Sequence, residues 1–497
     1  MIDLGMPKEI GQMMVPSGYR KHLEMVVRQR VFEELRKDTY SKLILASEYP
    51  EDPITVFFPE VWIKWLKGKG LQVNAHSSRW LRWKVISYTL LQGLRRWGRL
   101  FLTSMTDSSV NGLSKASSFA MLVSMFPGAS PQNSEEAASH RGIATWYRDG
   151  KLRLKNEDII ITNIPNGSNK IIDECLQISS WNTLGLKNWG KRLRFLASGF
   201  GIVVASILQT LSGRWWAAFI LRDAIELAYY SLYESDQLAS TYVFIDPHFA
   251  RRPLWTFYAE GGGSRIILTL YSLNNQVIQK QGEEKPPYMP GWGLVNWPHY
   301  AVWDIEHKAF IENFDKINAE IDVVGPILLS DSVTPIPQLP KKTIAVFDVS
   351  VFRKGRYVDI GYPQNYYIDE VLKEFLEVVY EIVTRAGYTI AYKPKRYSDM
   401  YSHAYLALVR DFSLRDGVVH VDAGISPDRL LDAVDAAISI PFTSTAFIAR
   451  NKGLKSVHFN PSNLAVCENG FRHGIPVLGT KKALERWVAS LDDEKAP

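Results

Sequence analysis

The chain contains very little cysteine, with only Cys175 and Cys467 among its 497 residues. Two cysteines cannot form a disulfide framework or a thiolate metal cluster, and such a composition is typical of a reducing compartment. The amino-terminal residues also lack a basic segment followed by an apolar one, which is the pattern of a secretory signal. The sequence therefore predicts a cytoplasmic protein.

Several catalytic motifs are missing as well. The chain has no His-Glu-x-x-His, no paired-cysteine spacing and no Asp-x-Asp, so we expect no metal site. His299 and His307 lie near Asp304 and Glu306, but this pattern is more typical of a strand and a helix start than of a ligand set. The triple glycine at 261–263 is neither a P-loop nor a dinucleotide fingerprint, so we expect no cofactor.

Acidic residues are absent from residues 61–106. This stretch contains five tryptophans (Trp62, Trp65, Trp80, Trp83, Trp97) and nine cations (Lys64, Lys67, Lys69, Arg79, Arg82, Lys84, Arg95, Arg96, Arg99). Tryptophans and cations at helical spacing favour a helix lying on an anionic bilayer. Single-stranded nucleic acid and a solvated structural face are the alternatives. No OB, RRM or KH pattern accompanies the patch, so we expect no nucleic-acid partner.

A second apolar feature is the uncharged run 195–213. Its length just reaches what a bilayer span requires. It contains several small and polar residues, and cations flank both ends, which gives no orientation signal. The pattern favours a core helix or an interfacial hairpin with Trp215 and Trp216 over a true span.

Strands and helices alternate along the chain, and no internal repeat is visible. In the first part we expect a strand at 54–58, a long helix at 78–125, a strand at 158–162 and apolar helices up to Tyr233. Further strands are expected at 242–245, 265–270, 300–304 and 321–324. Prolines then mark a linker, after which strand 342–347 and helix 367–385 open a second unit. The sequence predicts an α/β protein with domain 1–331, linker 332–341 and domain 342–497, and a helical insertion at about 61–235.

The most informative segment is Ser439 to Ala446, where a short apolar strand leads through hydroxyl residues into a helix. Pro441, Thr443, Ser444 and Thr445 lie in this loop. Free amides of a first helical turn and hydroxyl groups bind anions such as phosphate. An ordinary helix N-cap is the alternative interpretation.

A basic loop supports the phosphate interpretation. The strand that begins at Gly387 runs into Lys393-Pro394-Lys395-Arg396. In an open α/β sheet, ligands bind at the carboxyl ends of strands, where this loop and the hydroxyl loop are expected to lie. Together they would neutralise and hydrogen-bond a phosphate. Phe347 to Ser350, at the exit of another strand, is a further candidate loop.

Residues 240–480 resemble the bacterial polysaccharide-biosynthesis proteins named for a Pro-Phe-Thr-Ser motif. The resemblance rests on Tyr392–Arg396 and Ile440–Ser444. It implies a GT-B glycosyltransferase fold, with two Rossmann-like domains facing a cleft. It also implies a nucleotide-sugar donor and favours CMP-linked acidic sugars of the Kdo or nonulosonate kind. Related CMP-dependent transferases have a His-Pro pair where this chain has Lys393-Pro394, without the histidine.

The general base is expected in the first half. Glu260 precedes Gly261, Gly262 and Gly263, and family members resemble this in placing an acidic residue before a glycine-containing loop and a strand. We predict Glu260 as the base, with the glycine loop near the acceptor. Asp246 and His248 are the alternatives, and a helix end before a glycine stop is the structural explanation for Glu260.

The sequence thus predicts a metal-independent glycosyltransferase of O-antigen, lipopolysaccharide or capsule biosynthesis. It would lie peripherally on the inner face of the bacterial inner membrane and use a lipid-linked or saccharide acceptor. The alternatives are a UDP- or GDP-sugar transferase, a sugar-nucleotide epimerase of the same fold, and a non-enzymatic membrane- or nucleic-acid-binding protein.

Overall fold

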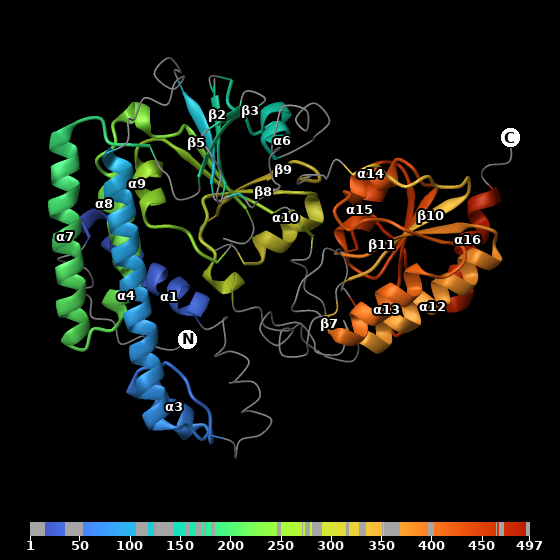
Figure 1. The fold of residues 1–497 in the computed structure, drawn as a ribbon, viewed down its shortest axis with the longest axis horizontal. Coiled ribbons are helices and arrows are strands. Elements are labelled where there is room, and N and C mark those ends of the chain that lie inside the picture. The colour runs from blue at the N-terminus through green and yellow to red at the C-terminus, as the bar shows by residue number, and fades with distance from the viewer. Residues whose placement is uncertain are drawn as a thin grey trace.

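The computed structural model contains two α/β domains that lie side by side (Figure 1). It describes residues 15–34, 53–105, 118–123, 125, 143–155, 157, 159–164, 170–172, 175–179, 184–245, 250–270, 272–273, 279–280, 291–314, 318–327, 334–349, 351, 368–395, 402–463, 465–466 and 472–493. Strands of the first domain end at Val323 and those of the second begin at Thr343.

The amino-terminal domain is built on an eight-stranded sheet in the order β3-β4-β2-β1-β5-β6-β8-β9, in which only β3 runs antiparallel to its neighbour. Its strands are β1 (Phe119–Leu122), β2 (Ile159–Ile164), β3 (Lys170–Ile172), β4 (Cys175–Ser179), β5 (Thr241–Ile245), β6 (Arg265–Thr269), β8 (His299–Val302) and β9 (Glu320–Val323). The central strands β1, β5 and β8 are buried at every position, which is why they appear in the sequence as continuous apolar runs.

The carboxyl-terminal domain has a six-stranded parallel sheet in the order β12-β11-β10-β13-β14-β16. Its strands are β10 (Thr343–Phe347), β11 (Thr389–Lys393), β12 (Val418–His420), β13 (Ala436–Ser439), β14 (Lys455–Phe459) and β16 (Val477–Leu478). Numbered within the domain, this is the order 3-2-1-4-5-6 of a Rossmann fold. The predicted fold class, an α/β protein with two Rossmann-like domains, is confirmed.

Helices connect the strands of both sheets. In the amino-terminal domain they are α1 (Leu23–Glu34), α3 (Glu60–Gly68), α4 (Ala75–Met105), α6 (Ile143–Asp149), α7 (Trp189–Leu211), α8 (Trp216–Tyr230), α9 (Trp255–Gly261) and α10 (Ile305–Glu312). In the carboxyl-terminal domain they are α12 (Asp369–Arg385), α13 (His403–Ser413), α14 (Pro427–Leu431), α15 (Ser444–Asn451) and α16 (Lys481–Asp493). Short 3₁₀ turns are η1 (Ser17–His22), η4 (Ser235–Gln237) and η6 (Trp292–Leu294).

The predicted organisation of the first half is corrected in three respects. Residues 54–58 form an isolated bridge, in which Ile54 pairs with Val73, and no other described residue extends this pairing. The helix expected at 78–125 ends at Met105, and Phe119–Leu122 is instead the buried strand β1. The region 61–235 is not one helical insertion, because β1 to β4 fall within it and belong to the sheet.

Helices α4, α7 and α8 form a layer on the side of the amino-terminal domain that faces away from the carboxyl-terminal domain (Figure 1). α8 is the inner helix and is almost entirely buried. Buried ion pairs join α1 and α4 to α8. Arg30 of α1 lies 2.7 Å from Asp223, and Arg96 of α4 lies 2.8 Å from Glu226. Because both carboxylates lie on α8, these pairs fix the positions of α1 and α4 against it.

Two short strands join the domains outside the main sheets. β7 (Gln279–Lys280) follows β6 in the amino-terminal domain, and β15 (Ala465–Val466) follows β14 in the carboxyl-terminal domain. They pair antiparallel, with Ala465 opposite Lys280. A backbone ladder therefore connects the two domains in addition to the proline-rich segment.

Close packing of α4 on α8 makes a specific prediction. A Cβ at Gly93 would lie 2.5 Å from Leu221 Cδ2, whereas a Cβ at Gly98, on the same helix, would have no atom within 4 Å. Gly98→Ala should therefore stabilise the protein by about 0.5–1 kcal/mol, the helix-propensity gain. Gly93→Ala should destabilise it by about 1–3 kcal/mol through overpacking. Urea denaturation measures both, and equal stabilisation by the two changes would contradict the observed approach of α4 to α8.

Candidate functional site

The carboxyl-terminal sheet reverses its strand order between β10 and β13. β11 and β12 extend it on one side of β10, and β14 and β16 extend it on the other side of β13. In the register of this pair, Phe347 lies opposite Ser439. Open parallel sheets bind ligands outside the carboxyl ends of the strands at such a point. The loops after Phe347 and Ser439 therefore occupy the position where a ligand of this domain is expected.

The loop after β13 has an unusual backbone. Phe442 adopts φ of 61°, a left-handed conformation that is costly for an aromatic residue. Its ring is buried, and its centroid lies 5.7 Å from that of His458. This turn directs the chain into α15, whose N-cap is Thr443. The strain and its compensation by packing indicate that the direction of α15 is closely specified.

Hydroxyl groups line the start of α15. Thr445 Oγ1 lies 3.1 Å from Ser439 Oγ and 3.0 Å from Thr443 Oγ1. No side chain caps the helix, since Thr443 Oγ1 donates instead to the carbonyl of Ile440 at 3.3 Å. First-turn amides of a helix carry partial positive charge and bind anions. The ordinary N-cap interpretation therefore does not account for Thr443, whose hydroxyl belongs to a set of three at the switch point.

Asp348, directly after β10, organises the neighbouring basic loop. It is buried and accepts hydrogen bonds from the hydroxyls of Tyr392 and Tyr405, at 2.6 and 3.0 Å, and from the amide of Lys395 at 3.2 Å. Burial raises the pKa of Asp348, although these hydrogen bonds oppose the shift. Asp348 thereby ties the loop after β11 to the switch point.

The three cations of the basic loop differ in position. Lys393 is buried, and its Nζ donates to the carbonyl of Ala423 at 3.1 Å, so it holds the loop after β12. The Lys395 side chain reaches solvent. Surrounding protein lowers the pKa of Lys395 by desolvation, which the charge of Asp348 opposes. Arg396 lies outside the described residues. Lys395 is thus the predicted cation that the described residues present to a ligand.

Ser444 of the hydroxyl loop contacts the other domain. Its Oγ accepts the amide N–H of Leu273 at 3.0 Å, in the segment after β6. One turn further along α15, the ring of Phe447 lies 5.6 Å from that of Trp303, which follows β8. The first turns of α15 therefore pack against the carboxyl ends of β6 and β8. Pro441 is within the turn before α15 and lies in the same buried segment as Phe442.

A polar cluster adjoins this contact. His473 of the carboxyl-terminal domain is buried and stacks edge-on against Phe447. Its Nδ1 lies 2.6 Å from Asp304 Oδ2, and its backbone N–H donates to Glu306 Oε2 at 2.5 Å. Burial opposes ionisation of Asp304, but the hydrogen bond and charge of His473 outweigh it and lower the pKa of Asp304. The cluster places two carboxylates of the amino-terminal domain, those of Asp304 and Glu306, next to a residue that contacts α15.

Asp304, Glu306 and His473 are also spaced closely enough to hold a cation, as are His299, Glu320 and Asp322. The two sets lie at opposite edges of the amino-terminal sheet, because His299 begins β8 and Asp304 follows it. In the set that contains Asp304, both oxygens of this carboxylate already have hydrogen-bond partners. Oδ2 contacts His473, and Oδ1 caps α10 by accepting the amide of His307 at 2.8 Å. Its oxygens therefore serve hydrogen bonds within the protein.

The predicted base Glu260 lies elsewhere. It is near the end of α9, and Gly261, Gly262 and Gly263 connect it to the start of β6. This is the amino edge of the sheet, whereas the carboxyl-terminal domain contacts the carboxyl edge. Glu260 forms an ion pair with the buried Arg252. The structural explanation, a helix end before a glycine stop, therefore accounts for Glu260 and its loop, and the geometry does not support a role beside the donor.

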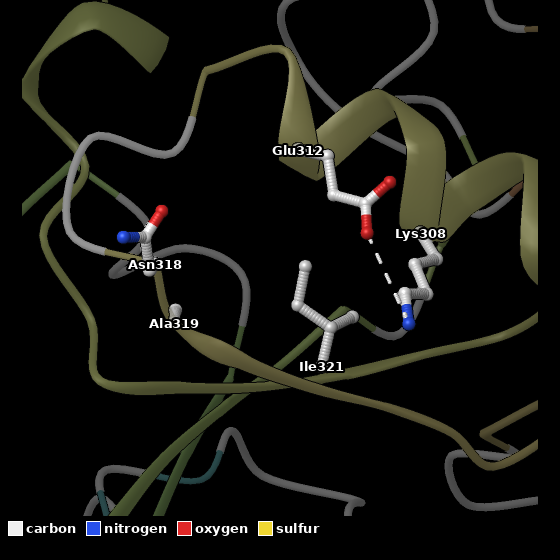
Figure 2. Close-up of a pocket in the computed structure, with 5 residues that line it drawn as sticks. All are labelled: Lys308, Glu312, Asn318, Ala319 and Ile321. Carbon is white, nitrogen blue, oxygen red and sulfur yellow. Dashed lines mark ion pairs between the residues drawn. The ribbon is translucent and has the colours of Figure 1, made fainter.

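The alternative bases Asp246 and His248 follow β5 and lie outside the described residues. Figure 2 shows a hollow between α10 and β9 that is lined by Lys308, Glu312, Asn318, Ala319 and Ile321. It lies at the amino edge of the sheet, and the two charged groups among its described lining residues, Lys308 and Glu312, are paired with each other at 3.9 Å. We therefore do not assign the functional site to this hollow.

Several of the predicted membrane residues do not face solvent. Trp62 is buried, and Trp97 packs between α4 and Gly199 of α7. Arg96 is paired with Glu226 inside the helical layer, where its charge is neutralised. The remaining predicted aromatic residues are exposed (Trp65, Trp80, Trp83), as are most of the predicted cations (Arg79, Arg95, Arg99), and Arg82 is partly exposed.

Sequence reasoning missed His473 and gave Asp304 and Glu306 no role. The signal for Asp304 was present, since a carboxylate directly after a buried strand lies at the carboxyl edge of a parallel sheet. His473 gave no such signal, because 169 residues separate it from its partner Asp304 in the sequence.

Comparison with known structures finds similar folds at low sequence identity. A mutant of S. aureus TarM, in complex with Fondaparinux, alpha-GlcNAc-glycerol and UDP, has a TM-score of 0.33 and 10% identity, over 54% of this chain and 52% of that one. The lipopolysaccharide outer core galactosyltransferase WaaB in its apo form has a TM-score of 0.35 and 11% identity, over 76% and 91%. A UDP-glucosyltransferase from Polygonum tinctorium has a TM-score of 0.33 and 9% identity, over 74% and 82%. Scores of this size say nothing about what the chain binds.

No curated protein matches the sequence. A family model does match, over residues 202–488, which is more than half of the chain and includes the hydroxyl loop, the basic loop and the contact between the domains. The protein belongs to the polysaccharide biosynthesis PFTS motif protein family.

Proposed function

We propose that the protein is a GT-B glycosyltransferase that transfers a sugar from a nucleotide donor during the biosynthesis of a surface polysaccharide such as O-antigen or capsule. The observation that carries the proposal is the start of α15. Its first-turn amides, which no side chain caps, lie with the hydroxyls of Ser439, Thr443 and Thr445 at the switch point of the carboxyl-terminal sheet. Asp348, directly after β10, ties the loop of Lys395 to the same point. Membership of the polysaccharide-biosynthesis family supports the same conclusion.

The chemistry that these groups supply is stabilisation of a departing phosphate. When the bond between sugar and phosphate breaks, negative charge develops on the phosphate oxygens. Preorganised amides, hydroxyls and an ammonium group stabilise that charge without reorganising. These groups can take the place of a divalent cation, and we therefore propose that transfer is metal-independent.

For the donor we propose a CMP-linked acidic sugar, with UDP- or GDP-sugars as the alternative. Support comes from Lys395, the accessible cation in the described part of the basic loop, and from Arg396, which follows it in the sequence. A donor whose sugar carries a carboxylate adds negative charge that such a loop would bind. An epimerase of the same fold would convert the nucleotide sugar without an acceptor, so product analysis distinguishes it from a transferase.

The acceptor hydroxyl needs a base on the amino-terminal side. We propose Glu306 for this role. Its Oε2 accepts the amide of His473, while Oε1 has no hydrogen-bond partner among the described residues. Asp304 suits a positioning role instead, because both of its oxygens are engaged. Asp246 and His248, which follow β5 in the sequence, remain the alternatives.

We further propose that the protein works peripherally at the inner face of the bacterial inner membrane, where a lipid-linked saccharide would be its acceptor. Support comes from the exposed tryptophans and cations of α3 and α4. A saccharide acceptor in solution is the alternative, and transfer assays with each acceptor type distinguish the two.

The donor site is tested by nucleotide binding. Calorimetry with CMP, UDP and GDP identifies the nucleotide, and we expect CMP to bind most tightly. Lys395→Gln should weaken binding of that nucleotide about ten- to a hundredfold, since a charge-assisted hydrogen bond is worth about 1.5–3 kcal/mol. Lys452→Gln, at the other end of α15 and paired with Asp428, is the matched control. Equal affinities in both variants would exclude the site.

The base is tested by transfer kinetics. Glu306→Gln should lower kcat by about 10²–10⁴-fold, because a positioned carboxylate typically supplies that factor, with donor affinity unchanged. Glu260→Gln should leave kcat near the wild-type value, because Glu260 lies at the other edge of the sheet. Loss of donor affinity together with kcat in Glu306→Gln would instead identify Glu306 as a tie between the domains.

Metal independence is tested by removing divalent cations. Transfer should proceed at the wild-type rate in excess EDTA, because the phosphate is stabilised by protein groups. A rate that falls in EDTA and recovers with Mg²⁺ or Mn²⁺ would contradict the proposal. In that case Asp304, Glu306 and His473 are the first ligands to vary.

A further inference from the structure

The outer face of α7 is an exposed apolar stripe. Leu193, Phe200, Leu208 and Leu211 are between 58% and 69% exposed, and Val204 is 36% exposed. From Ala197 to Leu211 no exposed residue carries a charge. Large contiguous apolar surfaces are rare on soluble proteins and mark interaction sites. The stripe therefore needs a covering partner.

The inner face of α7 packs against α8 and α4. Ser206 Oγ donates to the carbonyl of Ala217 at 3.0 Å, and the ring of Phe195 packs edge-on against Tyr229. Gly199 lets Trp97 of α4 approach closely. Among the described helices α7 alone is long and apolar enough to cross a bilayer, yet 44% of its apolar window is buried in the protein. A helix fixed on one face can present only the other to lipid.

α4 lies beside α7 and continues the exposed surface (Figure 1). Its outward residues alternate large apolar groups with cations. Trp80, Trp83 and Leu102 are 65%, 45% and 67% exposed, and Arg79, Lys84, Arg95 and Arg99 are exposed between them. Lys84 lies 5.4 Å from the ring of Trp80, and Arg192 at the start of α7 lies 5.2 Å from that of Trp189. Tryptophan paired with a cation suits the headgroup level of a bilayer.

The charge of this surface is predominantly positive. At its edges Glu60 pairs with Arg79 at 3.6 Å, and Glu234 and Asp236 pair with Lys187 and Lys191. Neither the segment 61–106, which contains most of α3 and all of α4, nor the segment 175–222, which contains α7, has an aspartate or glutamate. Such a surface is complementary to acidic lipid. Pairing with a second copy would bring like charges together. Nucleic acid would meet the uncharged middle of α7, which offers nothing to a phosphate.

We propose that α7 lies flat in one leaflet of an acidic bilayer, with its apolar stripe (Leu193, Phe200, Val204, Leu208 and Leu211) among the acyl chains. The cations of α4 and those at the two ends of α7 then contact the headgroups. The protein is held from one side and does not cross the membrane. This inference rests on the proposed function, because a lipid-linked acceptor gives the reason for membrane attachment. It adds which surface of the protein attaches to the membrane.

The test is flotation of purified, detergent-free protein with preformed phosphatidylcholine vesicles, with and without phosphatidylglycerol. We expect binding to the acidic vesicles. Phe200→Asn combined with Leu208→Asn and Leu211→Asn should weaken it at least about tenfold, since each buried apolar side chain contributes more than a kcal/mol. Arg95→Gln with Arg99→Gln should weaken it in a salt-dependent way. Leu414→Asn, which changes a 79% exposed leucine of the other domain, is the matched control and should have no effect.

Circular dichroism and nucleotide binding, measured without vesicles, verify that each variant is folded. Wild-type vesicle binding by the folded α7 triple variant would overturn the proposal. So would light scattering that shows a wild-type dimer which the triple variant dissociates, because α7 would then be a subunit interface. RNA binding that depends on Arg95 and Arg99, with no vesicle binding, would also overturn it. Vesicle binding is measured without donor or acceptor, so its failure is distinct from failure of the transferase proposal.

Discussion

The direction of α15 is the constraint on which the candidate site depends. Pro441 favours an extended residue before it, Phe442 turns the chain through a left-handed conformation, and Thr443 opens the helix. Ser444 then bonds the backbone of the other domain at Leu273. Each residue of the four-residue motif thus has a separate physical task. Together they orient a positively polarised helix end toward the contact between the domains.

The same contact joins the two halves of the proposed reaction. The hydroxyls proposed to bind phosphate lie at the start of α15 in the carboxyl-terminal domain. The carboxylates of Asp304 and Glu306 lie at the start of α10 in the amino-terminal domain. His473 contacts Phe447 of α15 with its ring and also bonds Asp304 and Glu306. Because His473 is buried, it acts as a spacer that fixes the distance of Asp304 and Glu306 from the helix. In the proposed reaction, the donor and acceptor groups would therefore share one junction between the domains.

The fold was more predictable from the sequence than the site. Strands such as β5, β10 and β13 are buried on both faces, so they appear as apolar runs bounded by turn residues. Phe119–Leu122 was missed because it is short and follows a helix of the same apolar character. Glu260 was misjudged because closeness to glycine does not reveal which edge of a sheet a loop occupies. His473 was missed because its partners come from a distant part of the sequence, which only the tertiary fold brings near.

The ladder between β7 and β15 constrains how the domains can move. A body attached to another at a single flexible linker can swing in any direction. Here the amino- and carboxyl-terminal domains are joined both by the segment around residues 334–340 and by the pairing of Ala465 with Lys280. The contacts of Ser444 with Leu273 and of His473 with Asp304 hold the domains together between these two attachments. Separating the domains would therefore first break the contacts of Ser444 and His473, and the β7–β15 ladder would then limit how far the two sheets move apart.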